Sequence, residues 1–286
     1  MDAKAFCPGH ITGFFQICDS DDILSMGSRG AGLCITLGAT SSVKVEDSAK
    51  QQISVMIDGK ESKAEVTTEA LRYILGHAKS RVEVNTTLDL PQSQGFGMSA
   101  AGSLSSALAL AHLLGKDRQM AFEAAHIAEI KWKCGLGDVS AIHGGGITIR
   151  KKPGLPPKGE VIRIPGAPDV VLAVVGARLL TRDVLSDAQK RNAINASGSR
   201  KVDALVKSPS IEKLMEFSAD FASETGLASR RILEAMGAAS KLGMASMSML
   251  GNSVFAMGDV PGLEAVLSGF GRTWTCKVDT EGPMIL

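Results

Sequence analysis

The sequence predicts an α+β chain with two domains. Strand-like runs come first, two long helical patterns follow between residues 99 and 133, and shorter strands then alternate with helices after residue 170. Strands and helices that are segregated in this way along a chain are typical of α+β folds. We predict domains at residues 1–165 and 166–286, with the boundary just after a short strand at 160–164.

The elements of the first domain are predicted from periodicity and turn signals. Residues 32–45 and 51–57 resemble strands, and we expect them to pair around the Asp58-Gly59 turn signal. A third strand-like run covers 81–90. Apolar residues recur at helical spacing over 99–114 and 117–133, which predicts two consecutive helices. Short strands are expected at 146–150 and 160–164.

The second domain is predicted to mix strands and helices. Strands are expected at 170–175, 253–257 and 273–278, with helices near 210–241 and 261–269. The polar segment 180–200 is interpreted as a solvated helix, with a substrate lid as the alternative. The methionines at 244, 247 and 249 are expected to fill gaps in the core, as flexible thioether chains usually do.

Composition favours a metabolic enzyme. The chain has 286 residues, of which 44% are hydrophobic, and a formal net charge of +1. A near-neutral balance without basic runs gives no electrostatic footprint for nucleic acid. The five cysteines form no C-x-x-C pair, which favours a reducing compartment. Because charges interrupt every long apolar run, we expect a cytoplasmic protein without a membrane partner.

The most informative segment is the glycine-rich stretch Pro91-Gln-Ser-Gln-Gly95-Phe-Gly97-Met-Ser99, which leads directly into a predicted helix. Glycine lets the backbone adopt positive φ and approach a ligand closely. A helix that starts here would direct its free N–H groups and positive dipole end at an anion. The segment therefore predicts a phosphate cradle.

Three interpretations of this cradle remain open from the local sequence. Small residues alone can serve tight packing of a strand against a helix. Gly95-x-Gly97-x-x-Ala100 also fits a dinucleotide-binding pattern, but Asp117 opens a second helix where that fold needs a parallel strand. The third interpretation is a nucleoside triphosphate held without a Walker lysine, because no G-x-x-x-x-G-K-[ST] motif occurs.

The segment from Pro91 to Ala101 resembles the central motif of the GHMP kinases, P-x-x-x-G-L-G-S-S-A-A. Phe96 and Met98 depart from that motif, so only Ser99 keeps a hydroxyl in the serine pair. The resemblance continues in Cys7-Pro8-Gly9-His10, where His10 replaces a basic residue, and in 249–254, which lacks most of the motif's glycines. It implies the two-domain GHMP kinase fold: an N-terminal domain like part of a ribosomal protein and a ferredoxin-like C-terminal domain.

Residues 8–15 and the glycine-rich Gly27-Ser-Arg29-Gly30-Ala-Gly32 are similar to the archaeal subgroup that phosphorylates pantoate. This implies transfer from ATP, with Mg²⁺, to the 4-hydroxyl of (R)-pantoate, giving 4-phosphopantoate for coenzyme A synthesis. One alternative is a kinase for shikimate, homoserine or a mevalonate-like acid. Another is a nucleotide-binding sensor without turnover. The sequence leaves the oligomeric state open, with a homodimer as one alternative.

The resemblance also assigns roles to single residues. Asp138 is the proposed catalytic aspartate, because it stands several residues before a double glycine, and Ser99 and Glu129 are the expected Mg²⁺ ligands. A helix N-cap is the alternative for Asp138, and a solvent-facing partner of Lys133 is the alternative for Glu129. The expected nucleotide contacts are Pro91, Gly95, Gly97, Met98, Ser99, Ala100 and Ala101.

The acceptor's carboxylate calls for a fixed cationic or N–H-rich partner. Arg29 is one candidate, because the flanking glycines permit close approach of its guanidinium. His10 is the other. A surface arginine in an ordinary turn and a packed core histidine are the respective alternatives.

Overall fold

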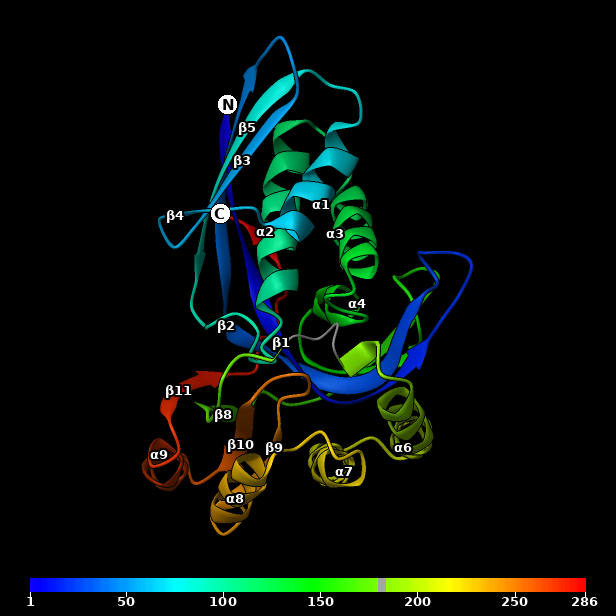
Figure 1. Ribbon diagram of the computed structural model, residues 1–286, viewed down its shortest axis with the longest axis vertical. Helices are drawn as coiled ribbons and strands as arrows, with labels where there is room; N and C mark the ends of the chain where they lie inside the picture. The colour runs from blue at the N-terminus through cyan, green and yellow to red at the C-terminus, as the bar shows by residue number, and fades with distance from the viewer. Residues whose placement is uncertain (180–183) are drawn as a thin grey trace.

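The computed structural model describes residues 1–179 and 184–286 and contains two β-sheets with helices. The larger sheet lies in the upper part of Figure 1 and the smaller sheet in the lower part. The α+β prediction is confirmed. The division at residues 165 and 166 stays a prediction.

The larger sheet is built around two long antiparallel strands, β1 and β2. Its main path runs β12-β1-β2-β5-β3-β4, while β6 pairs with the first part of β2 and β7 pairs with β6. The strands are β1 (Asp2–Cys18), β2 (Gly27–Asp47), β3 (Gln52–Ile57), β4 (Lys60–Ser62), β5 (Ser80–Leu88), β6 (Ile147–Lys152), β7 (Glu160–Ile164) and β12 (Met284–Ile285).

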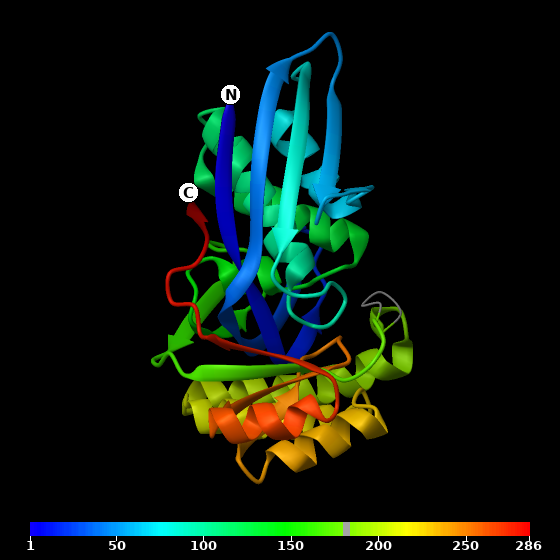
Figure 2. The ribbon, with the colours of Figure 1, turned by 90° about the vertical axis from the view of Figure 1, so that its left-hand side faces the viewer.

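Helices cover one face of this sheet, and Figure 2 shows the upper part of the opposite face turned toward the viewer. They are α1 (Glu65–Leu75), α2 (Met98–Leu113), α3 (Arg118–Trp132) and α4 (Asp138–Ile142). The α2 helix is composed of small and apolar residues, so it is buried on nearly all sides, between β1, β2, α1 and α3. Asp117 caps α3 by accepting a hydrogen bond from the backbone N–H of Gln119.

The smaller sheet has the strand order and antiparallel pairing of a ferredoxin-like unit. Its strands are ordered β11-β8-β10-β9, and they follow the chain as one strand, helices, two strands, a helix and a last strand. Its elements are β8 (Asp169–Val174), α6 (Ala188–Lys207), α7 (Ile211–Glu224), α8 (Arg230–Ala239), β9 (Gly243–Met247), β10 (Ser253–Gly258), α9 (Val260–Ser268) and β11 (Arg272–Lys277).

One predicted pairing is wrong. The strand at 52–57 does not pair with β2; it runs parallel to β5, and the Asp58-Gly59 turn connects it to the short strand β4. The turn signal was therefore real, but the hairpin lies one strand later. Residues 180–183 of the segment predicted as a helix or lid lie outside the described residues, and α6 forms its later part.

The first strand was not predicted, because Pro8, Gly9 and Gly13 interrupt its pattern. Register irregularities between Pro8 and Gly9 and between Thr12 and Phe14 let β1 pair along its whole length with β2 despite these residues. Within the described ranges, no helix has both the length and the apolar character that a membrane span requires.

Candidate active site

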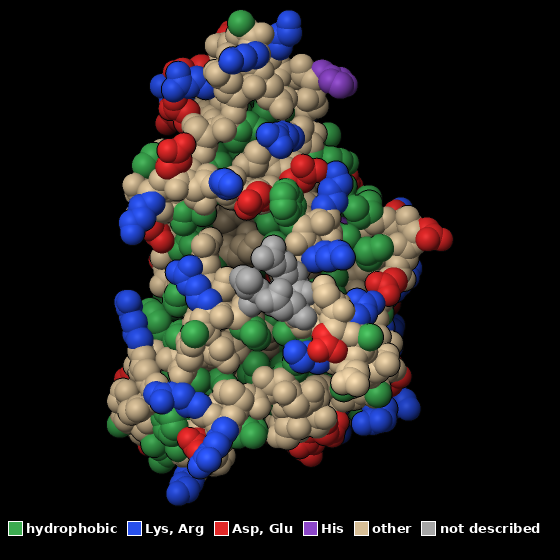
Figure 3. Space-filling model, in the orientation of Figure 1, with side chains coloured by type: hydrophobic (Ala, Val, Ile, Leu, Met, Phe, Trp, Pro, Cys, Tyr) green, Lys and Arg blue, Asp and Glu red, His purple; other side chains and the backbone are tan. Residues whose placement is uncertain are grey.

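A cavity of about 450 Å³ lies where the helical layer, the larger sheet and two loops near the smaller sheet meet. The molecule is hollowed at this place on the face shown in Figure 3. The lining includes residues of β1, the glycine-rich loop with the start of α2, the loop from α3 to α4, and the turn after β9. Further lining residues come from β2 to β6 and from the start of α1. The three motif segments singled out in the sequence therefore converge on one site.

Backbone hydrogen bonds join these segments to one another. The N–H of His10 donates to the carbonyl of Phe96 at 3.1 Å, and the N–H of Met249 donates to the carbonyl of Thr12 at 3.0 Å. Gly251 lies directly against the backbone of Gln94, where a Cβ would have no room. The segment at 249–254 thus packs against the glycine-rich loop and against β1.

The cradle has the geometry that an anion needs. Gly97 is the N-cap of α2 with φ of 68°, and no side chain caps the helix, so its first N–H groups remain available. Gly95 has φ of 78°, and a Cβ there would lie 2.7 Å from the carbonyl oxygen of Ser248. Both glycines are required by conformation and by space.

The predicted nucleotide contacts divide into two groups. Gly95, Gly97, Met98 and Ser99 line the cavity, and the Ser99 side chain is exposed to it. The side chain of Met98 is buried against Gly9, so it offers only its backbone. The remaining three are not cavity-lining residues: Ala100 and Ala101 are fully buried in the core and Pro91 is half-buried.

His10 and Asp138 form a hydrogen-bonded pair beside the cradle. His10 Nδ1 lies 2.7 Å from Asp138 Oδ1, and both residues line the cavity. Burial lowers the pKa of His10, and this outweighs the hydrogen bond from Asp138, which acts in the opposite direction. The imidazole is therefore neutral near pH 7 and donates from Nδ1 to the carboxylate.

Asp138 is the first residue of α4, and its N-cap is Gly137, so Asp138 is not a capping residue. Burial alone would raise the pKa of its carboxyl. The hydrogen bond from His10 and the positive charge of Arg150 outweigh burial and hold this pKa below its usual value. Asp138 is thus an ionised acceptor at the edge of the cavity.

Glu129 is buried beneath the loop that connects α3 to α4. It is 2% exposed, so it does not face solvent, and its Oε1 atom has no hydrogen-bond partner among the described residues. Burial, and secondarily the charge of Asp138, raise the pKa of Glu129 well above its usual value. Glu129 is not among the residues that line the cavity, but an orphaned buried carboxylate of this kind fits a cation.

Arg29, on β2, and Arg150, on the neighbouring strand β6, point to opposite faces of the sheet. The guanidinium of Arg29 donates to Asp203, to Gln16 and to the carbonyl of Lys151, away from the cavity. Side chains alternate along a strand, so its neighbours Ser28 and Gly30 face the other side. The structure does not bring Arg29 into the site.

Arg150, on β6, takes the position expected of Arg29. It is 2% exposed and lines the cavity, and within residues 1–179 and 184–286 its Nε and Nη1 atoms have no hydrogen-bond partner. Burial lowers the pKa of Arg150 and Asp138 opposes that change, but a guanidinium stays charged. The sequence held one signal for it: an arginine that directly follows the apolar residues of the strand Ile147-Thr-Ile-Arg150.

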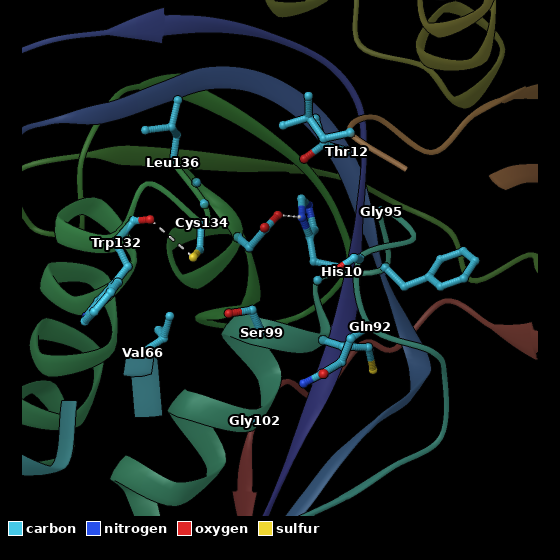
Figure 4. Close-up of a pocket in the computed structure, with 18 of the residues that line it drawn as sticks. His10, Thr12, Val66, Gln92, Gly95, Ser99, Gly102, Trp132, Cys134 and Leu136 are labelled. Carbon is cyan, nitrogen blue, oxygen red and sulfur yellow. Dashed lines mark hydrogen bonds and ion pairs between the residues drawn. The ribbon is translucent and has the colours of Figure 1, made fainter. Parts of the chain in front are cut away.

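The cavity has a polar end and an apolar end. Figure 4 shows Ser99 between His10 on one side and Val66 and Trp132 on the other. Ile57 and Leu88 from the sheet complete the apolar end. A ligand with an apolar base, a chain of phosphates and a small polar acceptor would match this order of surfaces.

Comparison with known proteins gives the same picture. Residues 64–146, which contain α1 to α4, match the family of the GHMP kinases N terminal domain. The chain is 36% identical to the pantoate kinase of Thermococcus kodakarensis over 261 residues, 89% of this chain and 87% of that protein. The chain belongs to the GHMP kinases, among the pantoate kinases.

Two further relatives align with this chain over almost its whole length. The pantoate kinase of Methanospirillum hungatei is 33% identical over 99% of this chain and 96% of its own length. A solved structure described as a phosphotransferase related to the coenzyme A biosynthesis pathway is 31% identical, with a TM-score of 0.90, and the alignment covers 100% and 99% of the two chains. This GHMP kinase is therefore an ATP-dependent small-molecule phosphotransferase.

Proposed function

We propose that this GHMP kinase transfers the γ-phosphoryl group of ATP to the 4-hydroxyl of (R)-pantoate, giving 4-phosphopantoate for coenzyme A synthesis. The observation that carries the proposal is the buried guanidinium of Arg150, with two unpaired nitrogen atoms, beside the His10–Asp138 pair. Such a site suits a small acid that also has a hydroxyl group. Relatives that are themselves pantoate kinases support the choice of acid.

The nucleotide is assigned to the cradle and to the apolar end of the cavity. The phosphates would receive hydrogen bonds from backbone N–H groups at Gly97, Met98 and Ser99, where the positive end of the α2 dipole adds attraction. The base would then lie toward Val66 and Leu88, because these side chains form the apolar end. Ala100 and Ala101 contribute by holding α2 in the core.

Ser99 and Glu129 are the proposed Mg²⁺ ligands. The hydroxyl of Ser99 is exposed to the cavity, and the orphaned carboxylate of Glu129 would supply one protein charge. Mg²⁺ usually retains several waters and binds phosphate oxygens, so one carboxylate and one hydroxyl are sufficient. When bound, the ion neutralises charge that develops on the transferred phosphoryl group.

Arg150 and Ser28 are the proposed partners of the acceptor's carboxylate. Both are buried and line the cavity on the side of Asp138. With the carboxylate held there, the hydroxyl group of pantoate would reach the Asp138 carboxylate. His10 would keep that carboxylate ionised and oriented through its Nδ1–H donor.

The reaction then needs one bond made and one bond broken at phosphorus. The acceptor oxygen attacks the γ-phosphorus, its proton passes to Asp138, and the bond from the γ-phosphorus to the ADP oxygen breaks. A positioned general base of this kind contributes roughly 10²–10⁴-fold to the rate. We place the reaction in the cytoplasm, in keeping with the cysteine pattern of the sequence.

The acceptor is tested by measuring ADP release from purified protein with Mg-ATP and (R)-pantoate, shikimate, homoserine or mevalonate, with the product identified by mass. We expect selective turnover of pantoate. Preference for another acid would replace the acceptor but keep the kinase site. ATP binding without turnover on any acceptor would identify a nucleotide sensor.

A further inference from the structure

The guanidinium of Arg150 lies in a slot whose walls are bare backbone. Gly30 stands directly opposite Arg150 in the β2–β6 pairing, and a Cβ there would lie 2.8 Å from Arg150 Nη2. On another side, a Cβ at Gly137 would lie 2.5 Å from Arg150 Nε and 3.0 Å from its Cδ. A side chain at either position would occupy the space of the guanidinium.

The packing around Gly137 leaves no room for a side chain. Gly137 has φ of −163° and ψ of 0°, a combination that lies outside the extended region. The atoms that its Cβ would meet are side-chain atoms of Arg150 and the hydroxyl of Ser28. A side chain at 137 would therefore collide with these two neighbours, which are the groups assigned to the acceptor's carboxylate.

Packing is what fixes the guanidinium. A long arginine side chain is usually fixed by the hydrogen bonds that its planar fork makes. In the part of the chain that the structure describes, Arg150 Nε and Nη1 have no such partners, although the residue is buried. Gly30 and Gly137 instead confine the guanidinium by close packing, which leaves Nε and Nη1 available for a ligand.

We propose that Gly137 is a positioning residue, which sets the place of the Arg150 guanidinium and thereby the place of the acceptor's carboxylate. The inference rests on the proposed function, in which Arg150 binds that carboxylate. Gly137 directly precedes Asp138, which is assigned to the acceptor's hydroxyl. Two consecutive residues therefore set the separation between the two ends of the acceptor, and with it the length of acid that the site accepts.

The first experiment compares Gly137→Ala with a matched glycine outside the cavity. Gly144 is suitable, because a Cβ there would likewise crowd the guanidinium of Arg163, and neither residue lines the cavity. We expect Gly137→Ala to raise KM for pantoate by about tenfold or more, the scale of a displaced charge-assisted hydrogen bond, with kcat and KM for ATP changed less. Gly144→Ala should leave all three within about twofold.

The second experiment uses chemical rescue. Arg150→Ala removes the guanidinium, and ethylguanidinium added to the assay has the shape to refill the slot. We expect it to restore part of the activity of Arg150→Ala and of Arg150→Ala/Gly144→Ala. It should restore none in Arg150→Ala/Gly137→Ala, where a methyl group occupies the slot.

The outcomes separate the positioning role from the proposed function. If Arg150→Ala raises KM for pantoate but Gly137→Ala does not, the positioning role is wrong and Arg150 keeps its role. Equal rescue in both double variants would also overturn it. If Arg150→Ala itself leaves KM for pantoate unchanged, the proposed carboxylate site is wrong. If Gly137→Ala lowers Tm and impairs kcat, KM for pantoate and KM for ATP to the same extent, Gly137 serves only folding.

Discussion

His10 Nδ1 lies 2.7 Å from Asp138 Oδ1, a contact between residues 128 positions apart in the chain. It joins the first motif to the start of α4, and the backbone N–H of the same histidine donates to Phe96 in the cradle. One residue of β1 therefore orients both the acidic group and the phosphate loop. Because the imidazole is neutral, the permanent positive charge at this end of the cavity belongs to Arg150.

Asp138→Asn should remove most of the turnover while leaving nucleotide binding intact. The amide keeps the shape of the carboxylate but cannot accept the hydroxyl proton, so we expect kcat to fall by roughly 10²–10⁴-fold. Kinetics and calorimetric titration of ATP measure the two effects. Asp203→Asn, outside the cavity, is the control. Full turnover by Asp138→Asn would remove this residue from the mechanism.

His10→Phe should move the acidic limit of activity to higher pH. In the native protein the hydrogen bond from His10 helps to hold the pKa of Asp138 low, so the carboxylate stays ionised well into the acid range. Without that donor, burial dominates and the pKa rises. The pH profile of kcat/KM measures this shift, with His112→Phe at an exposed position of α2 as the control. An unchanged inflection would contradict the account.

Glu129→Gln should stabilise the protein at neutral pH in the absence of Mg-ATP. The folded state raises the pKa of Glu129, so its contribution to stability is fully present below the unfolded pKa and is lost as pH rises through the folded pKa. A neutral amide avoids that loss, and we expect Tm at pH 7.5 to rise by about 2 °C or more.

The same substitution should raise the Mg²⁺ concentration needed for half-maximal activity. The gain in Tm should shrink at pH 4.5, where the native carboxyl is already protonated, and that comparison is the internal control. A lower Tm at both pH values would mean that Glu129 is a structural acid with a partner of its own.

The two arginines offer a direct comparison. Arg150→Lys keeps a charge but loses the planar fork, and we expect KM for pantoate to rise by about tenfold or more. Arg29→Lys should change it by less than about twofold, because Arg29 faces Asp203 on α6. Steady-state kinetics with saturating ATP measures both. The reverse ranking would restore Arg29 as the acceptor's partner.

Local sequence patterns predicted an element correctly where the whole pattern lies within that element. Helices were predicted at 99–114 and 117–133 because each repeats its apolar residues over several turns, and α2 and α3 lie within one residue of these bounds. Strand β7 was predicted with its observed bounds, 160–164. The ferredoxin-like order of the smaller sheet was not visible in these patterns, because pairing partners lie far apart in sequence.

The site was harder to predict, because its groups come from distant elements. The alternation of Ser28, Arg29 and Gly30 across β2 was the missing step. We expected the strand to begin only at residue 32 and the flanking glycines to bring Arg29 to the acceptor, but β2 begins at Gly27. The position of Arg150 in the site follows only from the pairing of β6 with β2, in which Arg150 lies opposite Gly30. That pairing brings together positions about 120 residues apart, which no local pattern specifies.

The most direct measurement compares (R)-pantoate with its amide, which keeps the 4-hydroxyl but lacks the carboxylate. If Arg150 holds that carboxylate beside the His10–Asp138 pair, kcat/KM for the amide should be lower by about tenfold to a hundredfold in the native protein. In Arg150→Ala, the ratio of kcat/KM for the acid to kcat/KM for the amide should be close to one. Equal turnover of the acid and the amide by the native protein would contradict the account.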